Sequence, residues 1–132
     1  MYSAQQELFT RLLIDLRRFF DTKGIVVYDT FLPPATVAYP FVYLGSFPQA
    51  DTPTKTNLIG TVSPVIHVYH NNPLQRGTVS TMIEEIKRIC RNIEETDHFK
   101  WLVTIPNQDI IPDNTVKPPL MHGIIEPVFK FS

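Results

Sequence analysis

The chain has 132 residues and a mass of 15.2 kDa, the usual size of a single domain, which leaves little room for a second hydrophobic core. Its composition, 43% hydrophobic and 19% charged, excludes a chain that is disordered throughout. Twelve lysines and arginines against thirteen acidic residues give a net charge of −1, which excludes the strongly basic surface that direct reading of nucleic acid requires.

The first predicted element is an amphipathic helix from Ala4 to Thr22. Ser3 stands where a side chain caps the first turn, and Gly24 follows the last turn, where a left-handed glycine commonly ends a helix. The apolar residues recur at helical spacing on one stripe, which we expect to face the core: Phe9, Leu12, Leu13, Leu16 and Phe20.

Extended structure is predicted for the next part of the chain. Residues 25–28 form a short β-rich run, and the prolines at 33 and 34 then forbid a helix or a central strand, so we expect a rigid crossover. Residues 41–47 and 61–70 are rich in aromatic and β-branched residues and predict the two strands of an extended hairpin. Between them, residues 49–58 are polar, so we expect a long mobile loop there.

A second amphipathic helix is predicted after the solitary Gly77, with Thr78 as its N-cap. Charged residues lie opposite an apolar stripe at helical spacing, which we expect to be buried: Val79, Met82, Ile83, Ile86, Ile89, Cys90 and Ile93.

The last third of the chain is predicted to be a β-hairpin punctuated by prolines. The β-like runs cover residues 101–106, 109–112 and 120–131. Together the elements predict one α+β domain over residues 1–132, in which an antiparallel sheet carries two amphipathic helices packed on one face. Because strand 41–47 is apolar at both parities, we expect the other face of the sheet to be unusually apolar or covered, for instance by another subunit.

The sequence also bears on the compartment. Cys90 is the single cysteine, so an internal disulfide is impossible, and a reducing compartment is the simpler reading. The first residues lack the basic flank and apolar core of a signal peptide, and no window approaches the ~20 apolar residues that span a bilayer. We therefore expect a soluble protein without a membrane partner.

No motif in the sequence predicts a catalytic, cofactor-binding or metal site. His67 and His70 are three residues apart in a predicted strand, so their side chains should point to opposite faces and not chelate one ion. His98 and His122 are isolated in the sequence. Residues 44–48 lack the second glycine of a nucleophile elbow, and the solitary glycines form no phosphate loop.

Three acidic residues near the end of the second helix are the nearest approach to an acid/base group: Glu94, Glu95 and Asp97. A solvated surface explains them better. Trp101 and the phenylalanines could frame a ligand pocket, but core packing explains them equally well. From the residues alone, we expect a small α+β domain without a catalytic signature.

Three stretches nevertheless carry a resemblance to a known family. They are the phrase Tyr39-Pro40-Phe41-Val42-Tyr43-Leu44-Gly45, a Thr-rich loop with Lys55-Thr56, and the pattern V-x-x-x-I-H-V-Y from Val62 to Tyr69. In this order, between two amphipathic helices, they resemble the tail terminator proteins of long-tailed phages, also called tail-to-head joining or tail completion proteins. The resemblance covers roughly residues 4 to 95 and leaves out the proline-rich segment after Trp101.

The resemblance implies a structural virion protein rather than an enzyme. It implies a hexameric ring, assembled in the host cytoplasm, that sits at the head-proximal end of the tail tube, stops its polymerisation and joins the head connector. The implied partners are further copies of the chain, the tail tube protein and the connector or head-completion proteins. In this family the long hairpin loop is the assembly-sensitive element, which here implies contact residues Gln49, Asp51, Thr52, Thr54, Lys55, Thr56 and Asn57; a tolerated insertion is the alternative.

Two other functions remain open at this point. A head-completion or stopper protein has a similar size and also forms rings, and it would differ by attachment to the head side. A small-ligand binding module or enzyme would need a pocket with convergent polar groups, for instance His67 with Tyr43 or His122. A structure with no enclosed pocket would remove that last reading.

Overall fold

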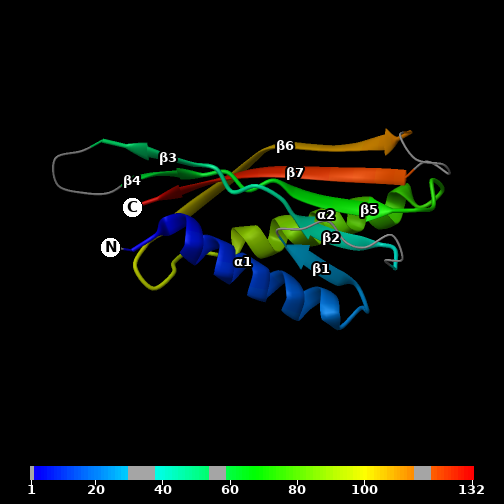
Figure 1. Cartoon of the computed structure of the whole chain (residues 1–132), viewed down its shortest axis with the longest axis horizontal. Helices are drawn as coiled ribbons and strands as arrows, with labels where there is room; N and C mark the ends of the chain where they lie inside the picture. Colours follow the sequence, from blue (N-terminus) through cyan, green and yellow to red (C-terminus); the bar gives the residue numbers. More distant parts are fainter. Residues whose placement is uncertain (1, 30–37, 54–58, 115–119) are drawn as a thin grey trace.

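The computed structural model describes residues 2–29, 38–53, 59–114 and 120–132, and within them it has an α+β fold. A seven-stranded sheet forms one layer and two helices form the other, lying on one face of the sheet (Figure 1). The first two strands pair in parallel, and the other described pairs are antiparallel. The predicted fold class is therefore confirmed. The expected crossover at the prolines 33 and 34 lies outside the described residues.

The last strand organises the sheet. The strand order is β1 (Val26–Asp29), β2 (Phe41–Leu44), β5 (Ile66–His70), β7 (Leu120–Phe131), β4 (Ile59–Val62) and β3 (Gln49–Thr52), and β6 (Trp101–Asp113) pairs with β7 off this path. The first part of β7 pairs with β5 and its end pairs with β4. Strand β6 follows nearly the whole of β7. This long hairpin confirms the prediction for the last third of the chain.

Pro106, Pro112 and Pro127 lie inside the strands of that hairpin, and Pro118 and Pro119 lie outside the described residues. Pro127 lies within β7 between Ile125, the last residue paired with β5, and Phe129, the first paired with β4 in chain order. A bulge in β6 between Thr104 and Asn107, which contains Pro106, stands opposite it. Because proline donates no hydrogen bond, it is tolerated at such a break in the pairing and on an edge strand such as β6.

Helix α1 (Ala4–Asp21) matches its prediction closely. The backbone N–H of Gln6 donates to the Ser3 hydroxyl at 3.1 Å, and Gly24 ends the helix with a φ of 71°. Its fully buried stripe consists of Leu8, Leu12 and Leu16, followed by Phe20 at the same spacing of four.

Helix α2 (Arg76–Arg91) buries the predicted apolar stripe, but it begins before the predicted cap. Its N-cap is Gln75 rather than Thr78. A turn at Asn72 places the start of the helix earlier in the chain. The Asn72 side chain accepts a hydrogen bond from the Leu74 N–H at 3.0 Å, and the Asn72 backbone carbonyl accepts one from the Gln75 N–H at 3.0 Å. Thr78 instead donates its hydroxyl proton to the Gln75 side chain at 2.7 Å.

Two predictions about the first hairpin were wrong. The predicted strand 61–70 is two strands, β4 and β5, separated at Pro64, which has no N–H to donate. The predicted loop 49–58 begins with a strand instead, because Gln49–Thr52 form β3 and pair with β4 in the register Gln49 to Val62. Residues 54–58 of that loop lie outside the described residues. Backbone pairing at the edge of a sheet needs no apolar side chain, so the polar residues of β3 gave no sign of a strand in the sequence.

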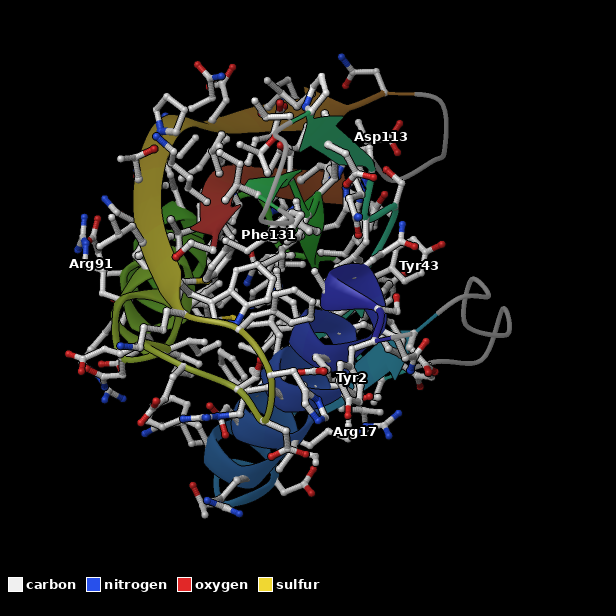
Figure 2. All side chains as sticks on the ribbon, turned by 90° about the vertical axis from the view of Figure 1, so that its left-hand side faces the viewer. Tyr2, Arg17, Tyr43, Arg91, Asp113 and Phe131 are labelled. Atoms are coloured by element: carbon white, nitrogen blue, oxygen red, sulfur yellow. The ribbon has the colours of Figure 1, made fainter. Side chains whose placement is uncertain are left out.

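The hydrophobic core fills the space between the helices and the sheet. Figure 2 shows Phe131, at the end of β7, inside the molecule, where it is 1% exposed. A Cβ at Gly123 of β7 would lie 3.0 Å from side-chain carbons of Val79 and Ile83, so α2 packs directly onto this strand. We call this side of the sheet the helix-covered face. No helix among the described residues is long and apolar enough to cross a bilayer.

Candidate functional site

The side of the sheet away from the helices carries a continuous row of rings. We call it the aromatic–histidine face and define it by five side chains on β2, β5 and β7: Phe41, Tyr43, His67, Tyr69 and His122. The sheet register places them side by side, because Phe41 pairs with Tyr69, Tyr69 pairs with His122, and Tyr43 pairs with His67. Neighbouring rings stack, with centroids 5.1 Å apart for Phe41 and Tyr69 and 4.3 Å apart for Tyr69 and His122.

Alternation along the strands produces this face. In β5, Ile66 and Val68 are fully buried, whereas His67 and Tyr69, which alternate with them, are half-buried on the opposite side. Phe41 is 4% exposed because its ring is enclosed by other rings, those of Tyr28, Tyr39 and Tyr69. The expectation of an unusually apolar second face is therefore met mainly by aromatic rings, several of them with polar tips.

Two histidines meet at the centre of the aromatic–histidine face. Nδ1 of His67 lies 2.8 Å from Nε2 of His122, so one ring donates a hydrogen bond to the other. Burial, together with the smaller effect of the neighbouring His122, lowers the pKa of His67 to about 4. Burial also lowers the pKa of His122, against the opposing effect of the Asp113 carboxylate. Both rings are therefore neutral at pH 7, as a hydrogen-bonded pair of imidazoles requires.

A glycine makes room for this pair. A Cβ at Gly45 would lie 3.0 Å from Nε2 of His67 and 3.1 Å from the Val65 carbonyl oxygen. Gly45 is the last residue of the sequence Tyr39-Pro40-Phe41-Val42-Tyr43-Leu44-Gly45. Glycine suits this position because the chain passes directly against the His67 ring, which leaves little room for a side chain. Tyr43, two residues earlier, stacks on the same ring with centroids 5.5 Å apart.

The structure separates some candidate residues and joins others. The contacts of His67 and His70 differ, because His70 accepts a hydrogen bond from the Asn72 N–H at 3.1 Å. His122, which is isolated in the sequence, is the partner of His67. This contact joins strands that are 55 positions apart in the chain, and no local pattern reports such a pairing. Tyr43, His67 and His122, named above for a ligand pocket, do converge.

They converge on a sheet face rather than in an enclosed pocket. A cavity of about 580 Å³ lies apart from them at the end of β7, between Ile59, Trp101, Leu102 and Phe131. Its walls include no histidine.

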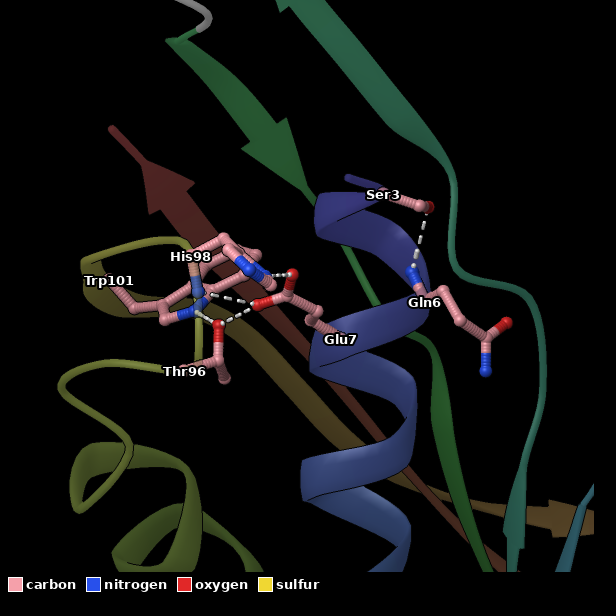
Figure 3. A network of polar contacts seen from close by, with 6 residues as sticks. All are labelled: Ser3, Gln6, Glu7, Thr96, His98 and Trp101. Atoms are coloured by element: carbon pink, nitrogen blue, oxygen red, sulfur yellow. Dashed lines mark hydrogen bonds and ion pairs between the residues drawn. The ribbon is translucent and has the colours of Figure 1, made fainter. Parts of the chain in front are cut away.

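A second polar cluster ties the start of α1 to the segment after α2 (Figure 3). One carboxylate oxygen of Glu7 accepts from the Thr96 hydroxyl at 2.8 Å and from the His98 N–H at 3.0 Å, and the other lies 2.7 Å from His98 Nδ1. The Trp101 indole donates to Thr96 at 3.0 Å, and the Tyr2 ring stacks on His98. Burial raises the pKa of Glu7, but the hydrogen bonds from Thr96 and His98 outweigh it and lower the pKa overall. The cluster is a clamp between chain segments.

The remaining candidates for chemistry behave as surface or core residues. Glu94, Glu95 and Asp97 are exposed. Within the described parts of the chain, no three His, Cys, Asp or Glu side chains are grouped as metal ligands. Burial raises the pKa of the Cys90 thiol to about 12, so it packs as a small apolar group.

The candidate assembly residues that can be placed lie on β3. Gln49, Asp51 and Thr52 are exposed, and the β3–β4 hairpin extends past the end of the helices (Figure 1). The Gln49 side chain donates to the Asp51 carboxylate at 2.7 Å, and its oxygen accepts from the Gln5 N–H at 3.0 Å. The other four candidates lie outside the described residues: Thr54, Lys55, Thr56 and Asn57.

Comparisons with known proteins identify a fold but no family. No protein-family model matches the chain, and no curated protein matches it. Among solved structures, a chain described as "Virion of native gene transfer agent (GTA) particle" is similar, with a TM-score of 0.68 and 17% sequence identity. The similarity covers 98% of this chain and 94% of that chain. The protein shares its fold with a virion component.

Proposed function

We propose that this chain is a structural virion protein that caps the phage tail tube as a ring and joins the tail to the head connector. The observation that carries the proposal is the fold, which agrees over 98% of this chain with a chain of a virion particle. The proposed location is the head-proximal end of the tail, reached by assembly in the host cytoplasm. The proposed partners are further copies of the chain in a hexamer, the tail tube protein and the connector or completion proteins.

The composition of the aromatic–histidine face supports a role in assembly. Aromatic residues are enriched and charged residues depleted at the centres of protein interfaces. On this face five rings are adjacent, and the two histidines among them are neutral at pH 7. Such a face loses little on contact with another protein, because the two imidazoles at its centre carry no charge that has to be removed from water.

Strand β3 supports the same role through its backbone. Among the described residues it pairs with β4 alone and stands at one end of the strand order, and its four side chains are exposed. A free strand edge is a ready template for pairing with another chain. The proposed contact residues on it are Gln49, Asp51 and Thr52, with Thr54, Lys55, Thr56 and Asn57 following them in the chain.

The proposal is tested by reconstitution with the purified full-length protein. Sedimentation across a concentration series should give a monomer in equilibrium with a ring, because contacts that order only on assembly make the ring weak in isolation. Adding tail tubes from the same particle should shift the equilibrium to the ring, visible by electron microscopy as capped tube ends. Binding to the connector but not to tubes would favour the head-completion or stopper role. A tight dimer at every concentration would contradict the ring.

A further inference from the structure

The His67–His122 pair has features that self-association does not require. The two imidazoles project from adjacent strands of the sheet, and the backbone pairing of His67 with Ile124 and of Tyr69 with His122 fixes their positions. Their facing nitrogens, Nδ1 of His67 and Nε2 of His122, are 2.8 Å apart. We propose that this pair binds a divalent transition-metal ion such as Zn²⁺, with these two nitrogens as its protein ligands.

The distance between the nitrogens is close to what the ion needs. Two imidazole ligands of a tetrahedral Zn²⁺ ion, each about 2.0 to 2.1 Å from the metal, lie about 3.3 Å apart. The observed separation is about 0.5 Å shorter, as expected for two nitrogens that share a hydrogen bond where the ion would enter. Small rotations of the two side chains open this gap, since both rings lie on a sheet face and not in a sealed core.

Binding of the ion requires neither imidazole to lose its proton, so both rings stay neutral. Each neutral ring carries one N–H, and the shared hydrogen bond places one of these protons between the two facing nitrogens. Ligation requires the Nε2–H tautomer of His67 and the Nδ1–H tautomer of His122. The ring that donates in the empty pair therefore moves its proton to its far nitrogen, and the ion takes the place of the shared proton.

Neighbouring residues hold the two rings next to each other on the face. Tyr43 stacks on His67, and Tyr69 stacks on His122 with an interplanar angle of 10°. Gly45 leaves the space that the His67 ring occupies. The carboxylate of Asp113 is near enough to His122 to act on it electrostatically, and a negative charge there favours a cation. Figure 2 shows Asp113 and Tyr43 on the side of the molecule opposite Arg91.

The site supplies two protein ligands. No third His, Cys, Asp or Glu is grouped with the pair among the residues that the structure describes, so water or a group from another molecule completes the coordination. A two-ligand site binds more weakly than a structural zinc site with four. The inference stands apart from the proposed function, since the isolated chain carries both ligands.

The test is a titration of the full-length protein, freed of metal with a chelator and then dialysed, with Zn²⁺ at pH 7. We expect saturable binding of one ion per chain by calorimetry. Replacing either ligand, His67→Ala or His122→Ala, should weaken binding by at least ~10-fold, since even outer-shell partners of metal ligands are worth about 10- to 100-fold. His70→Ala and His98→Ala are the matched controls and should bind like the original chain.

A measurement on the unaltered protein guards against variants that fail to fold. The ¹⁵N resonances of the His67 and His122 side chains should move on addition of Zn²⁺, at Nδ1 and Nε2 respectively, while those of His98 stay in place. Binding that survives in the double variant His67→Ala/His122→Ala overturns the proposal. So does the absence of saturation at Zn²⁺ concentrations up to ~1 mM, where even weak sites are occupied.

Discussion

The helix-covered face and the aromatic–histidine face are two sides of the same strands. On the first, Val42, Ile66 and Val68 are fully buried aliphatic side chains. On the second, Tyr43, His67 and Tyr69 are rings with polar tips that are half-buried, and no helix among the described residues covers them. Aliphatic side chains need a complete cover to exclude water, whereas Tyr and His keep hydrogen-bonding groups that water or a partner can meet. The helix-covered face is fully buried by the chain's own helices, whereas the aromatic–histidine face is suited to contact with another molecule.

The largest expected loss of stability comes from substitutions in the helices that pack on the helix-covered face. Ile86→Ala, in the centre of the α2 stripe, removes a fully buried side chain and should lower the free energy of unfolding by about 2 to 5 kcal/mol. Leu16→Ala in α1 should do the same. Glu85→Ala, whose carboxylate forms a surface ion pair with Arg88, is the control and should stay within ~0.5 kcal/mol. Chemical denaturation compares the three, and equal losses would show that the faces of the helices are wrongly assigned.

A smaller loss is expected at the clamp between α1 and the segment after α2. Glu7→Ala removes the acceptor of the hydrogen bonds from Thr96 and His98, and should cost about 1.5 to 3 kcal/mol, the range for hydrogen bonds to a charged group. Glu94→Ala, a nearby exposed carboxylate, serves as the control for charge alone. If both variants unfold at the same denaturant concentration, the clamp contributes nothing to stability.

The two faces also differ in how far the sequence predicts them. The stripes of α1 and α2 are local patterns, so residues such as Leu16 and Ile86 were assigned correctly to the core from spacing alone. The approach of His67 to His122 depends on the register between β5 and β7, which no segment of the chain encodes by itself. Strand β3 was not predicted, for another reason. Its four side chains are all exposed, so its sequence shows no alternation of buried and exposed residues.

The third prediction sharpens the comparison at the aromatic–histidine face. Gly45→Ala places a methyl group 3.0 Å from His67 Nε2 and against a backbone carbonyl, and should cost about 1 kcal/mol, at the low end for overpacking because the ring can shift. Gly77→Ala, with nothing within 4 Å of the new methyl in the first turn of α2, should stabilise by about 0.4 to 1 kcal/mol. Thermal unfolding measures both. A Gly45→Ala protein with unchanged stability and unchanged His67 resonances would mean that Gly45 does not position the ring.

The fourth prediction concerns pH, in metal-free buffer. Since the folded state lowers the pKa of His67 from 6.5 to about 4, the unfolded chain binds more protons within that window, and stability should fall as the pH drops through it. The lowered pKa of His122 acts in the same direction. Glu7, with a pKa below 4.5, stays ionised in the upper part of the window and adds no slope there. His67→Phe should flatten the dependence between pH 5 and 6.5, and an equally steep dependence in that variant would assign it to other groups.

The smallest expected effect on stability is at the free edge of β3, and it separates folding from assembly. Asp51→Asn keeps the oxygen that accepts from the Gln49 side chain and removes only the charge, so the free energy of unfolding should change by less than ~0.5 kcal/mol. Combined with Lys55→Gln, it removes two charges of opposite sign, which are suited to fixing the orientation of neighbouring subunits and act on specificity more than on stability. The double variant should therefore melt like the original chain yet sediment with less ring and cap fewer tail tubes. Normal melting with undiminished ring formation would show that these charges have no part in assembly, and the contact would then have to come from the aromatic–histidine face, where Tyr69→Ala is the variant to examine next.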